Sequence, residues 1–246
     1  MRIGMIGTGR MGKAVAAAAS ETAHDIVQHF DVDSPLNSGG AEKCDALIDF
    51  SVPEALMHNV KIAVDCGIPF VTGTTGWYDS RDEVKDIVEK GNGAFLYASN
   101  FSIGVLLFRQ VVQQAAKLFG SFENFDFALH EIHHAQKMDS PSGTALHLGD
   151  DVRGAVPSKT HVQAGNPAEK IAKDALHISS TRVGAEAGTH RLFIDSAEDG
   201  IELTHRAKGR AGFAVGAIKV AEWLINRKGF YTIDDYVQSR LKQAAR

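Results

Sequence analysis

The 246-residue sequence has only two cysteines, no basic excess and no long apolar run. Cys44 and Cys66 stand in neither a CxxC pair nor a metal-type spacing, so this count suits a reducing compartment better than a disulfide framework. Lys and Arg together number 26 against 30 for Asp and Glu, which gives a net charge of −4. A dedicated nucleic-acid binder usually carries a basic excess, and we therefore expect no nucleic-acid partner.

Export and membrane signals are also missing. The chain starts with MRIGMIG, which lacks the charged start, the long apolar stretch and the cleavage site of a signal peptide. The longest apolar runs, such as GVLLF and AVAAAA, are far shorter than the ~20 residues of a membrane span. No low-complexity tract or fixed-period repeat interrupts the chain. We expect a soluble, cytoplasmic, globular protein without a membrane partner.

The first hundred residues alternate short apolar segments with helix-like segments. Continuous apolar strands between helices are typical of a parallel sheet covered on both faces. Ser51 and Glu54 have capping-box spacing with Pro53 in the first turn, and Ser80 and Glu83 repeat the spacing, so a helix is expected to begin at each pair. Strands are expected at Arg2–Ile6, Asp25–Asp31, Asp45–Phe50, Ile68–Gly73 and Ala94–Ser99.

The chain changes character after a long helix that is expected to end near Phe119. Four later segments look like strands with polar alternation, and Ala197–Gly200 should form a hairpin turn. This pattern predicts an α+β domain with a mixed or antiparallel sheet after a nucleotide-type domain. The strand-like segments are Phe125–His134, His177–Gly184, Thr189–Ser196 and Ile201–Ala207, and helices are expected at Phe213–Arg227 and Thr232–Gln243, as candidates to pack on the first domain.

A glycine-rich loop joins the first strand to the first helix. Gly7, Gly9 and Gly12 follow the strand, and Asp31 stands nineteen positions after Gly12 at the end of the next strand. Glycines allow a tight turn and close approach of a pyrophosphate, the helix N-terminus donates N–H groups, and the acid accepts ribose hydroxyl bonds. A tight turn without ligand is the alternative, and the four features together favour a dinucleotide site.

Two further segments should lie at the carboxyl ends of strands, where open α/β sheets bind ligands. They are Gly73–Gly76 and Ala98–Ser102. Ordinary turn chemistry explains them equally well.

The segment Glu131–Ala145, EIHHAQKMDSPSGTA, combines two histidines, a lysine and a Ser-Gly-Thr turn. Hydride delivery to a C=N or C=C bond leaves negative charge that a positioned His or Lys can quench with a proton. A basic cluster beside Gly-Thr donors would also hold carboxylates. His130, His133 and His134 raise the possibility of zinc. However, His133 and His134 should point to opposite faces of a strand, and no further ligand spacing completes a site, so we expect no metal.

This segment resembles the signature of the dihydrodipicolinate reductase family, E-x-H-H-x-x-K-x-D-x-P-S-G-T-A, and meets every fixed position. The resemblance implies reduction of the dicarboxylate 4-hydroxy-tetrahydrodipicolinate to tetrahydrodipicolinate with NAD(P)H, in lysine and diaminopimelate biosynthesis. It extends over nearly the whole chain through IDFSVPEA, GTTG, NFSIG, RVGAEAGTH and HRAKGRAGFAVGAIKVAEWL.

The resemblance also implies roles for individual residues. His133 is the acid–base residue and Lys137 the proton donor, while His134, Ser142, Gly143 and Thr144 bind the substrate. The residues implied to line the cofactor are Gly7, Thr8, Gly9, Arg10, Met11, Gly12, Asp31, Gly73, Thr74, Thr75, Ala98, Ser99, Asn100 and Phe101.

The implied fold is α/β: a Rossmann-type parallel-sheet dinucleotide domain, residues 1–104 and 211–246, and an α+β mixed-sheet domain for substrate binding and oligomerisation, residues 105–210. The family's usual assembly is a homotetramer. Two departures affect the adenosine pocket, because the glycine loop is one residue shorter than the family's G-x-x-G-R-M-G form and Pro35–Glu42 is short.

The cofactor is expected to be NADH in preference to NADPH, without exclusion of NADPH. Asp31 favours a free ribose, and Val32 and Asp33 follow it where many family members have an arginine. Arg10 and Lys13 are the cations placed to reach a phosphate.

Three rival functions stay open. An aspartate- or homoserine-type dehydrogenase is one, although Cys44 and Cys66 both fall in the nucleotide half, where neither suits the nucleophile of the aspartate-type enzyme. A non-catalytic NAD(H) sensor would not need Lys137, and a metal-dependent hydrolase would need further ligands.

Overall fold

The structure, a computed structural model, describes residues 1–165 and 167–244. The chain divides into two compact units: unit 1 comprises Met1–Ile103 and the chain from Arg210 onward, and unit 2 comprises Gly104–Gly209. The domain borders predicted from the sequence lie after residues 104 and 210, one residue later in each case. Among the described residues, no helix is both long enough and apolar enough to cross a membrane.

Unit 1 contains a six-stranded sheet in which every pair of neighbours is parallel, in the order β11-β5-β4-β3-β1-β2. From β1 the chain adds β2 on one side and β3, β4 and β5 on the other, so the direction reverses between β1 and β3. Ligands bind open α/β sheets at such a reversal. The strands are β1 (Arg2–Ile6), β2 (Asp25–Phe30), β3 (Ala46–Asp49), β4 (Phe70–Thr72), β5 (Ala94–Tyr97) and β11 (Gly229–Thr232).

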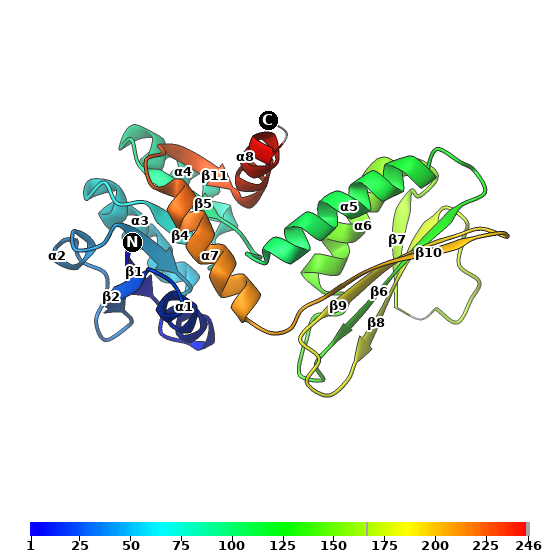
Figure 1. Cartoon of the computed structure of the whole chain (residues 1–246), viewed down its shortest axis with the longest axis horizontal. Helices are drawn as coiled ribbons and strands as arrows, with labels where there is room; N and C mark the ends of the chain where they lie inside the picture. The colour runs from blue at the N-terminus through cyan, green and yellow to red at the C-terminus, as the bar shows by residue number, and fades with distance from the viewer. Residues whose placement is uncertain (166, 245–246) are drawn as a thin grey trace. The chain divides into compact units, whose positions relative to one another are not determined.

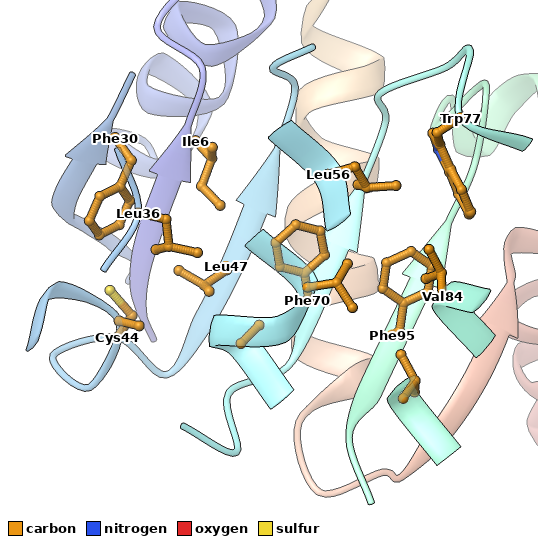
Figure 2. Close-up of a cluster of buried hydrophobic side chains, with 14 residues drawn as sticks. Ile6, Phe30, Leu36, Cys44, Leu47, Leu56, Phe70, Trp77, Val84 and Phe95 are labelled. Carbon is orange, nitrogen blue, oxygen red and sulfur yellow. The ribbon is translucent and has the colours of Figure 1, made fainter. Parts of the chain in front are cut away.

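Helices cover both faces of this sheet, as the apolar strands predict (Figure 1). Figure 2 shows the core beneath α3 and α4, where Leu56 and Val84 meet Phe70 and Phe95. The rings of Phe70 and Phe95 stack with their centroids 5.8 Å apart. The helices are α1 (Arg10–Ser20), α2 (Ser38–Ala41), α3 (Pro53–Asp65), α4 (Arg81–Lys90), α7 (Ala211–Leu224) and α8 (Ile233–Ala244), with a short 3-10 helix η1 (Tyr78–Ser80).

The C-terminal helices belong to unit 1, as predicted, and α7 packs on β3, β4 and β5. β11, which joins the edge of the sheet next to β5, is absent from the predicted strands. The predicted capping box of α3 is wrong. The helix is capped by Val52 without a side-chain bond, because the Ser51 hydroxyl donates to Asp49 Oδ1 at 2.5 Å instead. Ser80 caps α4, also without a side-chain bond.

Unit 2 contains a five-stranded mixed sheet in the order β10-β9-β6-β8-β7. The pairs β9–β10 and β6–β9 are antiparallel, while β6–β8 and β7–β8 are parallel. The predicted hairpin is confirmed: β9 and β10 meet at a turn in which the Ser196 amide donates to Asp199 O at 2.8 Å. The strands are β6 (Asp126–His133), β7 (His161–Ala164), β8 (Ala175–Arg182), β9 (Thr189–Asp195) and β10 (Gly200–Arg206).

Two helices, α5 (Ile103–Phe119) and α6 (Gly143–Ala155), pack on this sheet. Leu148 of α6 and Val112 of α5 meet Leu129, Ile178 and Ile194 in a second core. β7 and α6 are both absent from the predicted elements. The Ser-Gly-Thr sequence, interpreted as a turn, instead begins α6, because Ser142 caps the helix by accepting a bond from the Ala145 amide at 3.2 Å.

Candidate active site

The glycine loop of unit 1 brings the end of β1 close to the start of α1. Gly7 has φ of +86°, and a Cβ there would lie 2.5 Å from Phe50 O. A Cβ on Gly12 would lie 2.1 Å from Gly7 O, so strand and helix touch only because both residues are glycine. Nothing lies within 4 Å of a Cβ built on Gly9. Helix α1 begins with Arg10 and Met11, and its N-terminus is therefore open to a ligand.

Asp31 follows β2 and is fixed against this loop. Its Oδ2 accepts bonds from the Thr8 hydroxyl and from the Thr8 amide, the latter at 3.0 Å, and its Oδ1 accepts from the Val32 amide at 2.9 Å. The Thr8 hydroxyl and then these amides hold the pKa of the Asp31 carboxyl below its usual value. The loop thus presents an ionised, exposed carboxylate at the edge of the sheet.

A hollow of about 260 Å³ lies beside Asp31 and the glycine loop. Its apolar lining includes Leu36 and Ala55, and its polar lining includes Asn59. The side chain of Asn59 is 3 % exposed, and its Nδ2 makes no hydrogen bond within residues 1–165 and 167–244. The hollow therefore offers an unused donor at the edge where a dinucleotide is expected.

Asp49 ends β3 and is completely buried. It accepts hydrogen bonds from the Ser51 hydroxyl, from Thr72 Oγ1 at 2.6 Å and from Thr74 Oγ1 at 2.8 Å. Burial raises the pKa of its carboxyl, and the three hydroxyls offset only part of that rise. Asp49 joins the segments that follow β3 and β4, and it does not figure among the predicted site residues.

The predicted residues after β4 are thereby divided. The Thr74 hydroxyl is taken by Asp49 and its carbonyl by Trp77 Nε1 at 2.8 Å, whereas Thr75 is exposed. Gly73 is held close, because a Cβ there would lie 2.1 Å from the Phe50 ring. The Gly73 amide donates to Asp49 O at 2.8 Å and the Thr74 amide to Thr72 Oγ1 at 3.0 Å, so Thr75 is the side chain of this segment that faces solvent.

The predicted residues after β5 divide in the same way. Ala98 and Phe101 are buried, and the Phe101 ring meets the Phe50 ring edge-on at 5.8 Å. Ser99 is exposed, and Asn100 Oδ1 accepts a bond from the Ser102 amide at 2.8 Å. Ser99 and Asn100 are therefore the side chains of this segment that reach the surface.

Strand alternation in unit 2 assembles a second polar site. Phe127, Leu129, Glu131 and His133 of β6 are buried in turn, which places the last two on the helix-covered face. The sheet register sets His190 of β9 directly opposite Glu131. Ser180 of β8 is the other neighbour of Glu131, and Arg182 pairs with His133.

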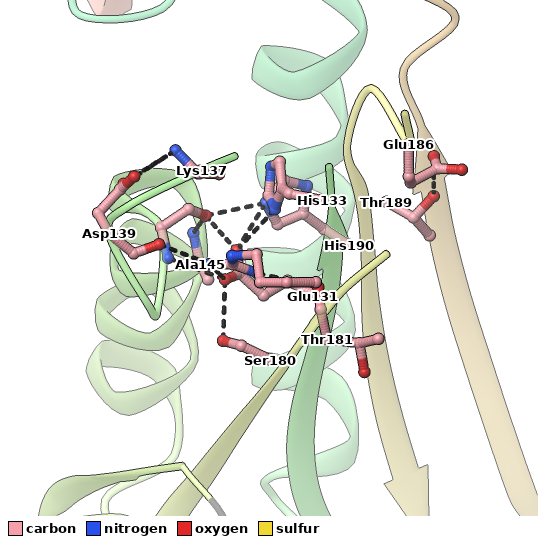
Figure 3. Close-up of polar contacts among 12 residues, drawn as sticks. Glu131, His133, Lys137, Asp139, Ala145, Ser180, Thr181, Glu186, Thr189 and His190 are labelled. Atoms are coloured by element: carbon pink, nitrogen blue, oxygen red, sulfur yellow. Dashed lines mark hydrogen bonds and ion pairs between the residues drawn. The ribbon is translucent and has the colours of Figure 1, made fainter. Parts of the chain in front are cut away.

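The Glu131 carboxylate, which is 0 % exposed, accepts four hydrogen bonds from two segments, the start of α6 and β8 (Figure 3). Oε1 accepts from the Ser142 amide at 3.0 Å, from Ser180 Oγ at 2.8 Å and from Arg182 Nη2 at 2.8 Å. Oε2 accepts from the Ser142 hydroxyl. His133 Nδ1 lies 3.3 Å and His190 Nε2 3.6 Å from Oε2.

These residues form the Glu131 network: Glu131, His133, Ser142, Ser180, Arg182 and His190. Burial alone would raise the pKa of the Glu131 carboxyl, but His133, His190, Ser142 and Arg182 together outweigh burial and hold the pKa far below its usual range. The network thus contains a buried anion that is ionised at neutral pH.

Glu131, His133 and His190 also bring three possible metal-ligand atoms within 4.8 Å of one another. The histidines weighed for zinc from the sequence were His130, His133 and His134, and the structure sets a different trio together. The donor set does not suit a cation, because Arg182 already places a positive charge on Oε1 and the Ser142 hydroxyl occupies Oε2.

The remaining predicted residues of unit 2 lie around the start of α6. Ser142 caps the helix, and no atom lies within 4 Å of a Cβ built on Gly143, so there is open space beside Gly143 in the first turn, which continues to Thr144. A helix N-terminus binds carboxylates through free N–H groups and its dipole. Lys137 Nζ lies 2.7 Å from Asp139 Oδ1, and the Lys137 amide donates to His134 O at 3.1 Å.

Comparison with known proteins gives this arrangement a family. The model described as "Dihydrodipicolinate reductase, N-terminus" matches residues 1–101, and that described as "Dihydrodipicolinate reductase, C-terminus" matches residues 104–237. The chain belongs to the dihydrodipicolinate reductase family.

Curated relatives of this family cover the chain almost completely. A 4-hydroxy-tetrahydrodipicolinate reductase of Christiangramia forsetii is 36% identical over 242 residues, which are 98% of this chain and 100% of the relative. One from Archaeoglobus fulgidus is 33% identical over 262 residues, covering 97% of this chain and 100% of the relative.

Solved structures share the fold. The dipicolinate-bound dihydrodipicolinate reductase from Paenisporosarcina sp. TG-14 aligns with a TM-score of 0.78 at 22% identity, over 96% of this chain and 98% of that one. A probable dehydrogenase from Thermotoga maritima aligns with a TM-score of 0.57 at 12% identity, over 91% of this chain and 89% of that one. The expected α/β fold, with a parallel sheet followed by a mixed sheet, is confirmed.

Several polar residues of this dihydrodipicolinate reductase fold are missing from the predicted site. Asp49 and His190 stand inside family motifs, IDFSVPEA and RVGAEAGTH, but no role was attached to them. Glu131 opens the signature segment and likewise had no role. The period-2 alternation of β6 places Glu131 on the same face as His133 and separates both from His134. This alternation is the signal that could have found Glu131. The residues missed are Asp49, Asn59, Glu131, Ser180, Arg182 and His190.

Proposed function

We propose that this chain is a 4-hydroxy-tetrahydrodipicolinate reductase, which reduces its substrate to tetrahydrodipicolinate with NAD(P)H in lysine and diaminopimelate biosynthesis. The observation that carries the proposal is the signature segment Glu131–Ala145. It places a buried imidazole, a lysine and an open helix N-terminus in one region of unit 2. Relatives that share about the whole chain carry the same name.

The cofactor belongs in unit 1. Its residues fit a dinucleotide because Gly9 leaves the N-terminus of α1 open and the hollow beside Asp31 contains the unused Nδ2 of Asn59. When bound, the reduced nicotinamide supplies the hydride. Asp31 accepts the ribose hydroxyls, and the exposed Thr75 and Ser99 line the rest of the edge together with the partly buried Asn100.

NADH is the preferred form of the cofactor, and NADPH is also used. Asp31 is ionised and is held by Thr8 and Val32, so a phosphate in that position meets a fixed negative charge. Val32 is 84% exposed and supplies no cation. Arg10, exposed at the start of α1, is the positive charge available to NADPH.

The substrate, a small dicarboxylate, binds in unit 2. A carboxylate of the substrate binds in the open space beside Gly143, at the positive end of the α6 dipole and next to Thr144, and His134 assists. The dipicolinate named in the related Paenisporosarcina structure is a flat dicarboxylate of the same kind. Ser142 acts by capping α6, because its hydroxyl already serves Glu131 and the Ala145 amide.

Proton transfer falls to His133 and Lys137. The conversion adds a hydride and a proton to the substrate and releases its 4-hydroxyl group as water. Lys137 donates the proton that offsets the charge left by the hydride, and His133 serves as the acid–base group. Asp139 holds the Lys137 ammonium at 2.7 Å before the proton is donated.

Among the described residues of unit 2, α5 and α6 are the two helices, and both contribute to a single core on one face of the mixed sheet.

The opposite face of that sheet is the surface for assembly into a homotetramer. Ala128, His130 and Ile132 of β6 point away from the helices and are only partly buried. Sedimentation velocity measures the assembly, and a monomer at micromolar concentration would refute this part of the proposal. The proposed location is the cytoplasm, where the cofactor is available.

The activity is tested by mixing purified protein with enzymatically generated 4-hydroxy-tetrahydrodipicolinate and following the absorbance of NADH or NADPH. We expect oxidation of both cofactors that depends on the substrate. A folded protein that binds NADH without turnover would refute the proposal and favour a sensor. Turnover of an aspartate-derived aldehyde in place of this substrate would favour the rival dehydrogenases.

A further inference from the structure

The Glu131 carboxylate lies beneath His133 and the first turn of α6 without a role in the reaction proposed above. We infer that Glu131 is a positioning residue of the reductase: it fixes the proton-bearing nitrogen of His133 and the carboxylate-binding turn at Gly143. This inference rests on the proposed function and deepens it. Glu131 is completely buried and does not touch the substrate itself.

The two oxygens of Glu131 have different tasks. Oε1 is filled by three donors, the Ser142 amide, Ser180 Oγ and Arg182 Nη2, at 2.8–3.0 Å. Oε2 accepts one donor, the Ser142 hydroxyl, and its other side faces the two imidazoles. The carboxylate therefore cannot rotate without losing Arg182, and Oε2 stays directed toward His133.

His133 Nδ1 is the nitrogen that meets this oxygen. It is buried and lies 3.3 Å from Oε2, but within residues 1–165 and 167–244 it makes no aligned hydrogen bond. A small rotation of the ring aligns the Nδ1–H with Oε2. A histidine whose Nδ1–H binds a carboxylate keeps its other nitrogen free for proton exchange.

The space beside His133 Nε2 supports the same orientation. Gly188 has φ of +142°, and a Cβ built there would lie 3.0 Å from Nε2. A side chain at this position would crowd the nitrogen that exchanges the proton. Gly188 thus leaves room for Nε2, while Glu131 holds Nδ1 on the other edge of the ring.

Glu131 also governs the start of α6. The amide and the hydroxyl of Ser142 both bind Glu131, and the same hydroxyl accepts the Ala145 amide at 3.2 Å. The same carboxylate therefore fixes both the first turn of α6 and the ring of His133. One buried anion sets the distance between the acid–base group and the carboxylate-binding turn.

The groups that face Glu131 come from every neighbouring segment. β6 contributes His133, β9 contributes His190, β8 contributes Ser180 and Arg182, and α6 contributes Ser142. Arg182 is the permanent positive charge among them and also donates to Asp139 O at 2.5 Å. Replacing Glu131 by Gln leaves Arg182 in place and removes the anion that attracts a proton to His133 Nδ1.

The test compares wild type with Glu131→Gln by the ¹⁵N shifts of the histidine rings and by the pH profile of kcat/KM. The His133 signal is assigned as the one missing in His133→Gln. In Glu131→Gln we expect the ¹⁵N shifts to show that the proton has left His133 Nδ1, and we expect the pH profile to change. We expect kcat to fall on the order of 10²-fold, with a smaller change in KM.

Two control variants separate positioning from stability. Asp151→Asn breaks the 2.7 Å ion pair with Arg109 in the same unit, and Asp49→Asn removes the other buried carboxylate. Both should change the melting temperature but leave the ¹⁵N shifts of His133 as in wild type. Glu131→Asp, which keeps the charge, should return these shifts toward the wild-type values.

Unchanged ¹⁵N shifts of His133 and an unchanged pH profile in Glu131→Gln would overturn the inference, and so would a failure of Glu131→Asp to restore them. If Glu131→Gln does not fold, the ¹⁵N shifts of wild-type His133 decide, since the inference requires a proton on Nδ1. These NMR readouts need no substrate. A wild type without turnover therefore refutes the proposed function, whereas unchanged ¹⁵N shifts refute the role of Glu131.

Discussion

Each unit of the molecule buries one carboxylate beside its candidate binding site, and the pKa values of the two carboxyls are shifted in opposite directions. Asp49 in unit 1 is surrounded by hydroxyl and amide donors, and burial raises the pKa of its carboxyl. Glu131 in unit 2 has hydroxyl donors as well, but Arg182 and two imidazoles lower its pKa. The same burial thus yields a structural hydrogen-bond centre in one unit and a fixed anion in the other.

This difference fits what each site has to do. The cofactor edge of unit 1 needs loops held at fixed positions, and the hydroxyl bonds that Asp49 accepts hold them. The substrate site of unit 2 needs a proton held on an imidazole, which a nearby anion favours. Four predictions test this difference between the two units.

The largest effect is expected from the groups assigned to proton transfer. His133→Ala and Lys137→Ala should each lower kcat on the order of 10²–10⁴-fold, because each removes a group that moves a proton in the transition state. Steady-state kinetics with circular dichroism as a check of folding measures this. A folded His133→Ala protein with nearly wild-type kcat would show that the anion of unit 2 serves no acid–base group.

The second effect separates the two carboxylates by stability. Glu131→Gln should lower the free energy of unfolding at neutral pH by about 3 kcal/mol, because it leaves the partly buried Arg182 without its anion. Asp49→Asn should cost less than about 1 kcal/mol, because it replaces a carboxylate that burial already disfavours in its charged form. Urea unfolding monitored by fluorescence gives both values. Equal losses would erase the distinction between the two sites.

Acid should act on the two carboxylates in opposite directions. The pKa of Glu131 is lower in the folded protein than in the unfolded chain, so its contribution is present above about pH 4.3 and is lost as the pH falls below that value. The pKa of Asp49 is higher when folded, so protonated Asp49 favours folding and that benefit is lost as the pH rises.

Melting temperatures measured from pH 7 downward therefore test the opposite pKa shifts of Glu131 and Asp49. Between wild type and Glu131→Gln the difference should shrink with acid, while between wild type and Asp49→Asn it should not. If the difference in melting temperature between wild type and Glu131→Gln stays constant down to about pH 3, the lowered pKa of Glu131 is contradicted.

The smallest effect concerns a third, exposed carboxylate, Asp31. Val32→Arg places a cation beside it and should raise kcat/KM for NADPH relative to NADH by about 10-fold, which corresponds to ~1.4 kcal/mol. Kinetics with both cofactors measure the ratio, and Val32→Gln is the matched uncharged control. An arginine that leaves the ratio unchanged, or a wild type that favours NADPH, would contradict the role given to Asp31.

The sequence predicts elements and motifs that depend on neighbouring residues. The glycine loop, the strands of unit 1 up to β5 and the β9–β10 hairpin all follow from local patterns. β11 could not be found in this way, because its four residues are a strand only by pairing with β5, far away in the sequence. The cap of α3 was wrong because Asp49 competes for the Ser51 hydroxyl.

The Glu131 network has the same non-local origin. His133 stands in a recognisable signature, but the position of His190 opposite Glu131 depends on the register of β6 with β9. Ser180 and Arg182 depend on the register of β6 with β8. Long-range pairing of this kind leaves no trace in spacing along one chain.

The most direct test of the reductase function uses NADH that carries deuterium at the transferable position of the nicotinamide. With 4-hydroxy-tetrahydrodipicolinate present, mass spectrometry should find the deuterium in tetrahydrodipicolinate formed by the wild type, and no such product with His133→Ala over the same time. Unlabelled product, or oxidised NADH without tetrahydrodipicolinate, would contradict hydride transfer to this substrate.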